Sequence, residues 1–172
     1  IPAFFSKWFM NRLNAGYVIQ VNPFNFRQHK PIKLSPQDVD VIVFWTKNPA
    51  PLLDYLPDID QKGFQYYFLF TLNSYPWYIE PNIPPLDYRI QIFKCLSEKI
   101  GPEKVIWRYD PILISNITTV EYHSENFRQI ASQLSGFTKR VIISFYDNYY
   151  KTHSKLQKLN QEISLQILDI RD

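Results

Sequence analysis

The 172-residue sequence has a single cysteine, Cys95, only four glycines, and no apolar run that approaches a membrane span. A lone cysteine excludes an internal disulfide and a cysteine-rich metal cluster within this chain. None of the glycines belongs to a G-x-G-x-x-G or Walker pattern, which excludes the usual phosphate-binding loops. A membrane span needs about 20 apolar residues, and no signal-peptide pattern is present. We therefore expect a cytoplasmic protein without a membrane partner.

Strong charge and metal-ligand spacing are also missing. The net charge of +3 is too small to indicate nucleic-acid binding, and the three histidines are scattered, so no metal site is expected. Hydrophobic residues make up 45% of the chain and aromatic residues 17%. This composition and length predict one domain with a substantial core over residues 1–172.

The first 34 residues predict a helix and a hairpin. Residues 2–15 carry an apolar stripe at helical spacing and are followed by a glycine. Residues 17–22 and about 30–34 read as two short antiparallel strands, although a proline weakens the second one.

Beyond this hairpin, apolar runs alternate with helical patterns. The runs lie at residues 41–45, 66–70, 105–109 and 141–145. The helical patterns lie at residues 51–60, 85–100, about 118–134 and from 149 onward. Strands that alternate with helices are usually parallel, and apolar strands without alternation are buried on both faces.

This order predicts an α/β fold of repeating βα units with a mostly parallel sheet. About four units are too few to close an eight-stranded barrel. The chain is therefore a partial barrel, an open sheet, or part of a longer barrel protein whose other strands lie outside it.

Arg108 and Asp110 stand out at the end of the third apolar run. They are two residues apart, so on a strand they share one face. A buried arginine needs a partner, which predicts an ion pair between them. This pair is equally consistent with a structural strand closure and with a site in which Arg108 binds a carboxylate or phosphate.

Other polar residues follow the remaining strands. Lys47 suits anion binding or a base of lowered pKa, or else it extends to water. Thr71 and Asn73 could orient a ligand or cap the loop backbone. The same two roles are open for Ser144 and Asp147, and Asp147 is also a candidate helix N-cap. Active sites of βα folds lie at the carboxyl ends of the strands. We therefore expect a small-molecule site there.

Several stretches together resemble one family. They are residues 1–4 with 8–13, 22–25, 43–49, 79–82, 105–111 and 143–147. The chain is similar over nearly its whole length to domain-of-unknown-function family 1848, whose members are mainly prokaryotic. The resemblance implies a partial TIM-like barrel. It also implies longer relatives with a C-terminal cysteine cluster similar to the iron–sulfur motif of radical S-adenosylmethionine enzymes.

The resemblance maps onto the strand ends but not onto a cluster. It covers Lys47, Thr71, Arg108, Asp110 and Asp147. Family members usually carry a Ser-Arg-Arg-Thr-Asp-like strand end before the first residue present here, and this chain also lacks the cysteine cluster. Iron–sulfur chemistry therefore maps to none of its residues, and no cofactor is expected in this chain alone.

Two main functions remain open. In the first, the chain is the barrel portion of a radical-S-adenosylmethionine-like enzyme of unknown substrate, inactive by itself. Its catalytic residues are then Lys47, Arg108 and Asp110. Its cofactor-binding residues are Thr71, Asn73, Ser144 and Asp147.

The alternative function is a non-catalytic module that binds a ligand or a nucleic-acid strand. Arg108 would then contact phosphate, and bases would stack on aromatic residues. Those residues are Trp45, Trp77, Trp107 and Tyr109, and the alternative is that most of them belong to the core. A third reading is a truncated relative with a structural role.

Overall fold

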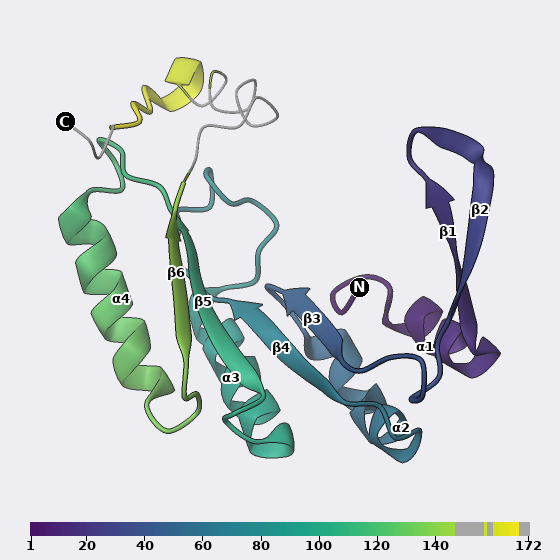
Figure 1. Ribbon diagram of the computed structural model, residues 1–172. Helices are drawn as coiled ribbons and strands as arrows, with labels where there is room; N and C mark the ends of the chain where they lie inside the picture. Colours follow the sequence, from purple (N-terminus) through teal and green to yellow (C-terminus); the bar gives the residue numbers. More distant parts are fainter. Residues whose placement is uncertain (147–156, 158–159, 169–172) are drawn as a thin grey trace. The chain divides into compact units, whose positions relative to one another are not determined.

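A computed structural model of the chain describes residues 1–146, 157 and 160–168 (Figure 1). The fold is mixed α/β, with a hairpin of antiparallel strands and a sheet of four parallel strands, β3 to β6. The chain divides into two compact units, residues 1–70 and 71–172, and each is described by itself. The α/β class predicted from the sequence is confirmed, and the barrel stays a prediction.

The first unit begins with helix α1 (Ser6–Ala15), which buries Phe9, Met10 and Leu13. Gly16 ends the helix with a left-handed φ of 75°, a conformation that glycine adopts without steric cost. Strands β1 (Tyr17–Asn22) and β2 (Asn25–Lys33) then form the hairpin. Strand β2 is longer than the predicted strand at residues 30–34. Pro31 does not end it, because proline is tolerated in an edge strand and both strands of this two-stranded sheet are edge strands.

The rest of the first unit is one parallel strand pair with its connecting helices. Strand β3 (Ile42–Thr46) leads into the 3₁₀ helix η1 (Ala50–Tyr55) and helix α2 (Leu56–Gln61), and strand β4 (Tyr66–Thr71) follows. The rings of Phe44 and Phe68 lie 4.9 Å apart on neighbouring strands. Phe9 of α1 meets Phe44 edge-on at 5.4 Å, so α1 packs on this pair.

The second unit contains helix α3 (Leu86–Ile100), strand β5 (Val105–Ile112), helix α4 (Val120–Leu134) and strand β6 (Val141–Phe145). Strands β5 and β6 are parallel. Trp107 of β5 stacks on Phe127 of α4, with ring centroids 4.8 Å apart, and α4 runs alongside these strands in Figure 1. The helix predicted from residue 149 onward begins outside the described residues.

Burial along β5 alternates, which corrects the expectation of strands buried on both faces. Val105, Trp107 and Tyr109 are buried, whereas Ile106 and Arg108 are only partly buried. Phe127 of α4 contacts Trp107 and Tyr109, so α4 covers this face of β5. The opposite face, which carries Ile106 and Arg108, is called the open face below. The predicted polar residues of β5 therefore lie on the face that its helix does not cover.

Helix α4 begins with a side-chain cap. Thr119 is the N-cap, and its hydroxyl accepts a hydrogen bond from the Tyr122 N–H. Thr118 is fully buried and donates to the Leu113 carbonyl at 2.6 Å. Its hydroxyl is therefore used to anchor the loop after β5.

Candidate functional site

The site is built around the carboxylate of Asp110, at the end of β5. Its Oδ2 forms an ion pair with Arg108 Nη2, and its Oδ1 accepts a hydrogen bond from Ser144 Oγ of β6. The Arg108 and Asp110 side chains are 13% and 9% exposed. Because both carboxylate oxygens are engaged, the side chain is held between two neighbouring strands. The predicted pairing of Arg108 with Asp110 is confirmed.

Asn73 lies beside this network and is 1% exposed. Its Nδ2 donates weakly to the backbone carbonyl of Asp110 at 3.5 Å, and Leu72 N–H donates to the Arg108 carbonyl at 2.9 Å. The Asn73 Oδ1 atom is buried and has no hydrogen-bond partner among the described residues. Leaving such an acceptor unsatisfied costs about 1–3 kcal/mol, so this oxygen is suited to receive a donor from a ligand.

Tyr75 holds the segment that follows Asp110. The Asp110–Pro111 peptide bond is cis. The Tyr75 hydroxyl donates to the Pro111 carbonyl at 2.7 Å and accepts from the Leu113 N–H at 2.8 Å. Burial raises the pKa of Tyr75, so its hydroxyl stays protonated as this donor. The backbone on the far side of Asp110 is therefore fixed as well.

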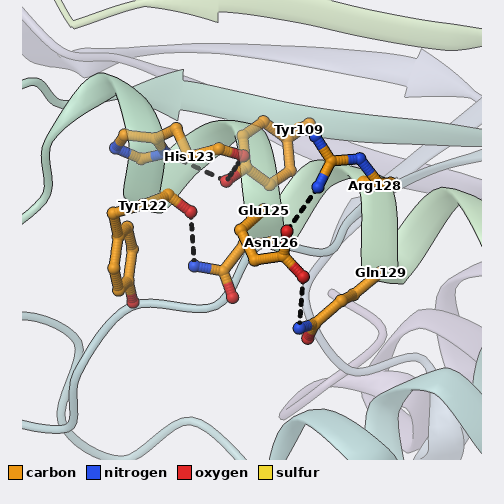
Figure 2. Close-up of polar contacts among 7 residues, drawn as sticks. All are labelled: Tyr109, Tyr122, His123, Glu125, Asn126, Arg128 and Gln129. Carbon is orange, nitrogen blue, oxygen red and sulfur yellow. Dashed lines mark hydrogen bonds and ion pairs between the residues drawn. The ribbon is translucent and has the colours of Figure 1, made fainter.

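On the helix-covered face, Tyr109 and His123 form a second polar pair, shown in Figure 2. His123 Nε2 lies 3.0 Å from the Leu113 carbonyl, which can only accept, so Nε2 carries the proton. The Tyr109 hydroxyl then donates to His123 Nδ1 at 2.9 Å. Burial lowers the pKa of His123 and raises that of Tyr109, so both groups stay neutral. This histidine supports the strand end and is not arranged as a metal ligand.

Arg89 of α3 is a residue that the sequence reasoning missed. It is 5% exposed, and its guanidinium donates to the carbonyl oxygens of Pro84 and Asn73, both at 2.9 Å. Burial lowers the pKa of Arg89, while the charge of Glu80 raises it. The sequence did contain a signal for its burial, because Arg89 lies three residues after Leu86 and therefore on the apolar side of the helix.

For three of the predicted residues, a place in this network stays a prediction. Thr71 is buried at the end of β4. Lys47 directly follows β3 in the first unit and is half-buried, and its place in the site stays a prediction. Asp147 lies outside the described residues.

The aromatic residues proposed for base stacking separate into two groups. Trp45 and Trp77 are 61% and 78% exposed. Trp107 and Tyr109 are 3% and 1% exposed, so for these two the alternative of a core role holds and stacking on bases does not.

The described residues contain no group of three or more His, Cys, Asp or Glu side chains placed to hold a metal ion. An iron–sulfur cluster of the radical type needs several thiolates. This chain has only Cys95, half-buried on α3. Its residues therefore do not fit such a cluster.

The fold and the site define an α/β protein with a polar network at the carboxyl ends of parallel strands. The family described as Domain of unknown function (DUF1848) matches residues 1–170, and the chain belongs to this family. No curated protein and no solved structure matches the chain. Within the described part of the chain, every helix is too short or too polar to cross a membrane.

The buried histidine predicts a pH-dependent stability. The pKa of His123 is lower in the folded chain than its usual value of about 6.5. Below that value the unfolded chain binds a proton that the folded chain does not, so the free energy of unfolding falls as the pH falls. Above it, His123 contributes no pH dependence.

Urea denaturation at about pH 7.5 and about pH 5.5 measures this effect. His123→Gln retains a donor for the Leu113 carbonyl but cannot titrate. The unaltered chain should lose more stability between the two pH values than this variant, since the other histidines are common to both. An equal loss in the two proteins would show that His123 titrates alike in the folded and unfolded states.

Proposed function

We propose that this chain is the ligand-binding portion of an enzyme, and that a small molecule binds at the carboxyl ends of β5 and β6. The ligand carries a carboxylate together with an amino or hydroxyl donor. The family resemblance implies a more specific proposal, in which the enzyme is radical-S-adenosylmethionine-like and its substrate is unidentified. Lys47, Arg108 and Asp110 are its catalytic candidates.

The unsatisfied Asn73 Oδ1 is the observation that carries this proposal. A purely structural network gains nothing from a buried acceptor without a donor, because the oxygen loses its water and receives no replacement. A ligand ammonium or hydroxyl group would satisfy it. This hydrogen bond would also fix the orientation of the ligand, with its donor group directed at Asn73.

Arg108 supplies the complementary charge for the ligand carboxylate. A guanidinium has five N–H donors in a planar fork, which is more than one carboxylate can accept. Asp110 holds the guanidinium in place and is itself held by Ser144, so little side-chain entropy would be lost on binding. S-adenosylmethionine has both required groups, an α-carboxylate for Arg108 and an α-ammonium for Asn73.

The iron–sulfur chemistry itself is not assigned to this chain, because its single cysteine cannot supply the ligands. What its residues do in this proposal is bind and orient the ligand. The alternative of a non-catalytic ligand module makes the same binding prediction. The nucleic-acid form of that alternative is weaker at this face, because two of its four stacking residues are buried.

Calorimetric titration of the 172-residue chain with S-adenosylmethionine tests the site. Asn73→Leu removes the unsatisfied oxygen at similar volume, and Arg108→Lys keeps the charge without the planar fork. Each should weaken binding about tenfold or more, and Asn73→Leu should leave thermal stability equal or higher because no buried acceptor remains.

Arg128→Lys is the matched control, because Arg128 pairs with Glu125 on the surface and is 73% exposed. It should bind S-adenosylmethionine as the unaltered chain does. Binding that is equally strong in all four proteins, or a loss of stability in Asn73→Leu with binding unchanged, would assign the network to structure alone.

The radical-type form has its own test in a longer family member that carries the cysteines. Reconstitution with iron and sulfide should give a coloured cluster protein that cleaves S-adenosylmethionine. A colourless and inert product would leave ligand binding as the proposal and remove the radical class.

A further inference from the structure

The excess of positive over negative charge in this chain comes from its first 37 residues. Residues 1–37 contain five Lys or Arg side chains and no Asp or Glu, since the first acidic residue is Asp38. The remaining residues hold the other 14 of the 19 basic side chains against all 16 acidic ones. The net charge of +3 is therefore the sum of a basic first segment and a slightly acidic remainder. Such an uneven distribution of charge favours a polyanionic partner for the basic segment.

The β1–β2 hairpin presents much of this segment to solvent. All nine residues of β2 are exposed, three of them are Arg27, Lys30 and Lys33, and the hairpin extends away from α1 (Figure 1). Near the turn, the rings of Phe24 and Phe26 are 97% and 76% exposed. Two such rings on a small basic ribbon form an unusual surface, because exposed aromatic area is normally kept for binding.

The tip is held rigidly, which distinguishes it from a disordered loop. Asn22 Oδ1 accepts a hydrogen bond from the Phe24 N–H at 2.9 Å, and Asn22 Nδ2 donates to Gln28 Oε1 at 2.7 Å. This turn, closed by an asparagine side chain, fixes the backbone that carries Phe24. A ring carried on a fixed backbone loses less entropy when it stacks on a partner than a ring on a disordered loop.

The backbone of Phe26 is fixed by a second set of contacts. Asn25 Oδ1 accepts from the Arg27 N–H at 3.1 Å, and His29 Nε2 donates to the Phe26 carbonyl at 2.7 Å. Both exposed rings are therefore presented by a preorganised backbone.

One side of the hairpin is hollowed, with a volume of about 400 Å³. Gln20 and Lys30 are cross-strand partners and lie on one face, together with Gln28 two residues away. The hollow combines the Phe24 ring, these two amide side chains and the Lys30 ammonium. Aromatic rings stack on bases, amides hydrogen-bond to base edges, and ammonium groups bind phosphate.

We propose that the β1–β2 hairpin binds single-stranded nucleic acid, with Phe24 and Phe26 stacking on bases and Lys30 contacting phosphate. An anionic lipid surface would also attract the charge and the rings. However, Gln20, Gln28 and the tip asparagines would bring several amides to the lipid boundary, which opposes insertion. This inference uses a different surface from the proposed ligand site and does not depend on it.

Fluorescence anisotropy of a labelled oligothymidylate of about 15 nucleotides, added to the 172-residue chain at low salt, tests the inference. Phe24→Ala and Phe26→Ala should each weaken binding about tenfold. Lys30→Ala should reduce the slope of log affinity against log salt by about 0.7. All three side chains are exposed, so circular dichroism should show an unchanged fold.

Tyr88→Ala and Lys139→Ala are the matched controls, since both residues are exposed and lie in the other unit. They should leave the affinity unchanged. The inference is overturned by absent binding at low salt, by an equal effect of the controls, or by equal affinity for duplex DNA, which would reveal charge attraction alone. It is also overturned if the phenylalanines are needed only for binding to phosphatidylglycerol-containing vesicles.

Discussion

The carboxylate of Asp110 is the group on which the second unit's open face depends. It is nearly buried, and a carboxylate in that position is stable only with charge and hydrogen-bond partners. Arg108 and Ser144 supply them from β5 and β6, so one side chain ties two strands together and orients the arginine. Removal of Arg108 would leave a poorly compensated charge at the strand end. Removal of Ser144 would loosen the carboxylate that directs the guanidinium.

The polar groups around the end of β5 differ in how fully they are satisfied. On the helix side, Tyr109 and His123 satisfy one another and the Leu113 carbonyl, and Trp107 Nε1 donates to the Leu72 carbonyl at 2.8 Å. Beside the Asp110 carbonyl, Asn73 Oδ1 has no donor among the described residues. A structural face is expected to be complete, whereas a binding face leaves groups for its ligand. This contrast locates the proposed site better than the presence of charge does.

Much of this arrangement follows from sequence spacing. The i, i+2 relation of Arg108 and Asp110 is sufficient to place both on one face of a strand, and the apolar runs were long enough to mark all four parallel strands. The extent of β2 was missed because Pro31 is a strong local signal against a strand, and its tolerance depends on the absence of a neighbour. Arg89 was missed because its role is to donate hydrogen bonds to carbonyl groups of a loop, and no local sequence pattern reveals such contacts. The unsatisfied oxygen of Asn73 likewise depends on packing, and the meeting of Lys47 with Arg108 stays a prediction.

Backbone amide chemical shifts of the 172-residue chain, recorded with and without S-adenosylmethionine, test the central claim most directly. If the open face of β5 and β6 is the ligand site, the largest changes should fall on Asn73, Arg108, Asp110 and Ser144. Changes confined to α4 or to the hairpin, or no changes at millimolar ligand, would contradict it.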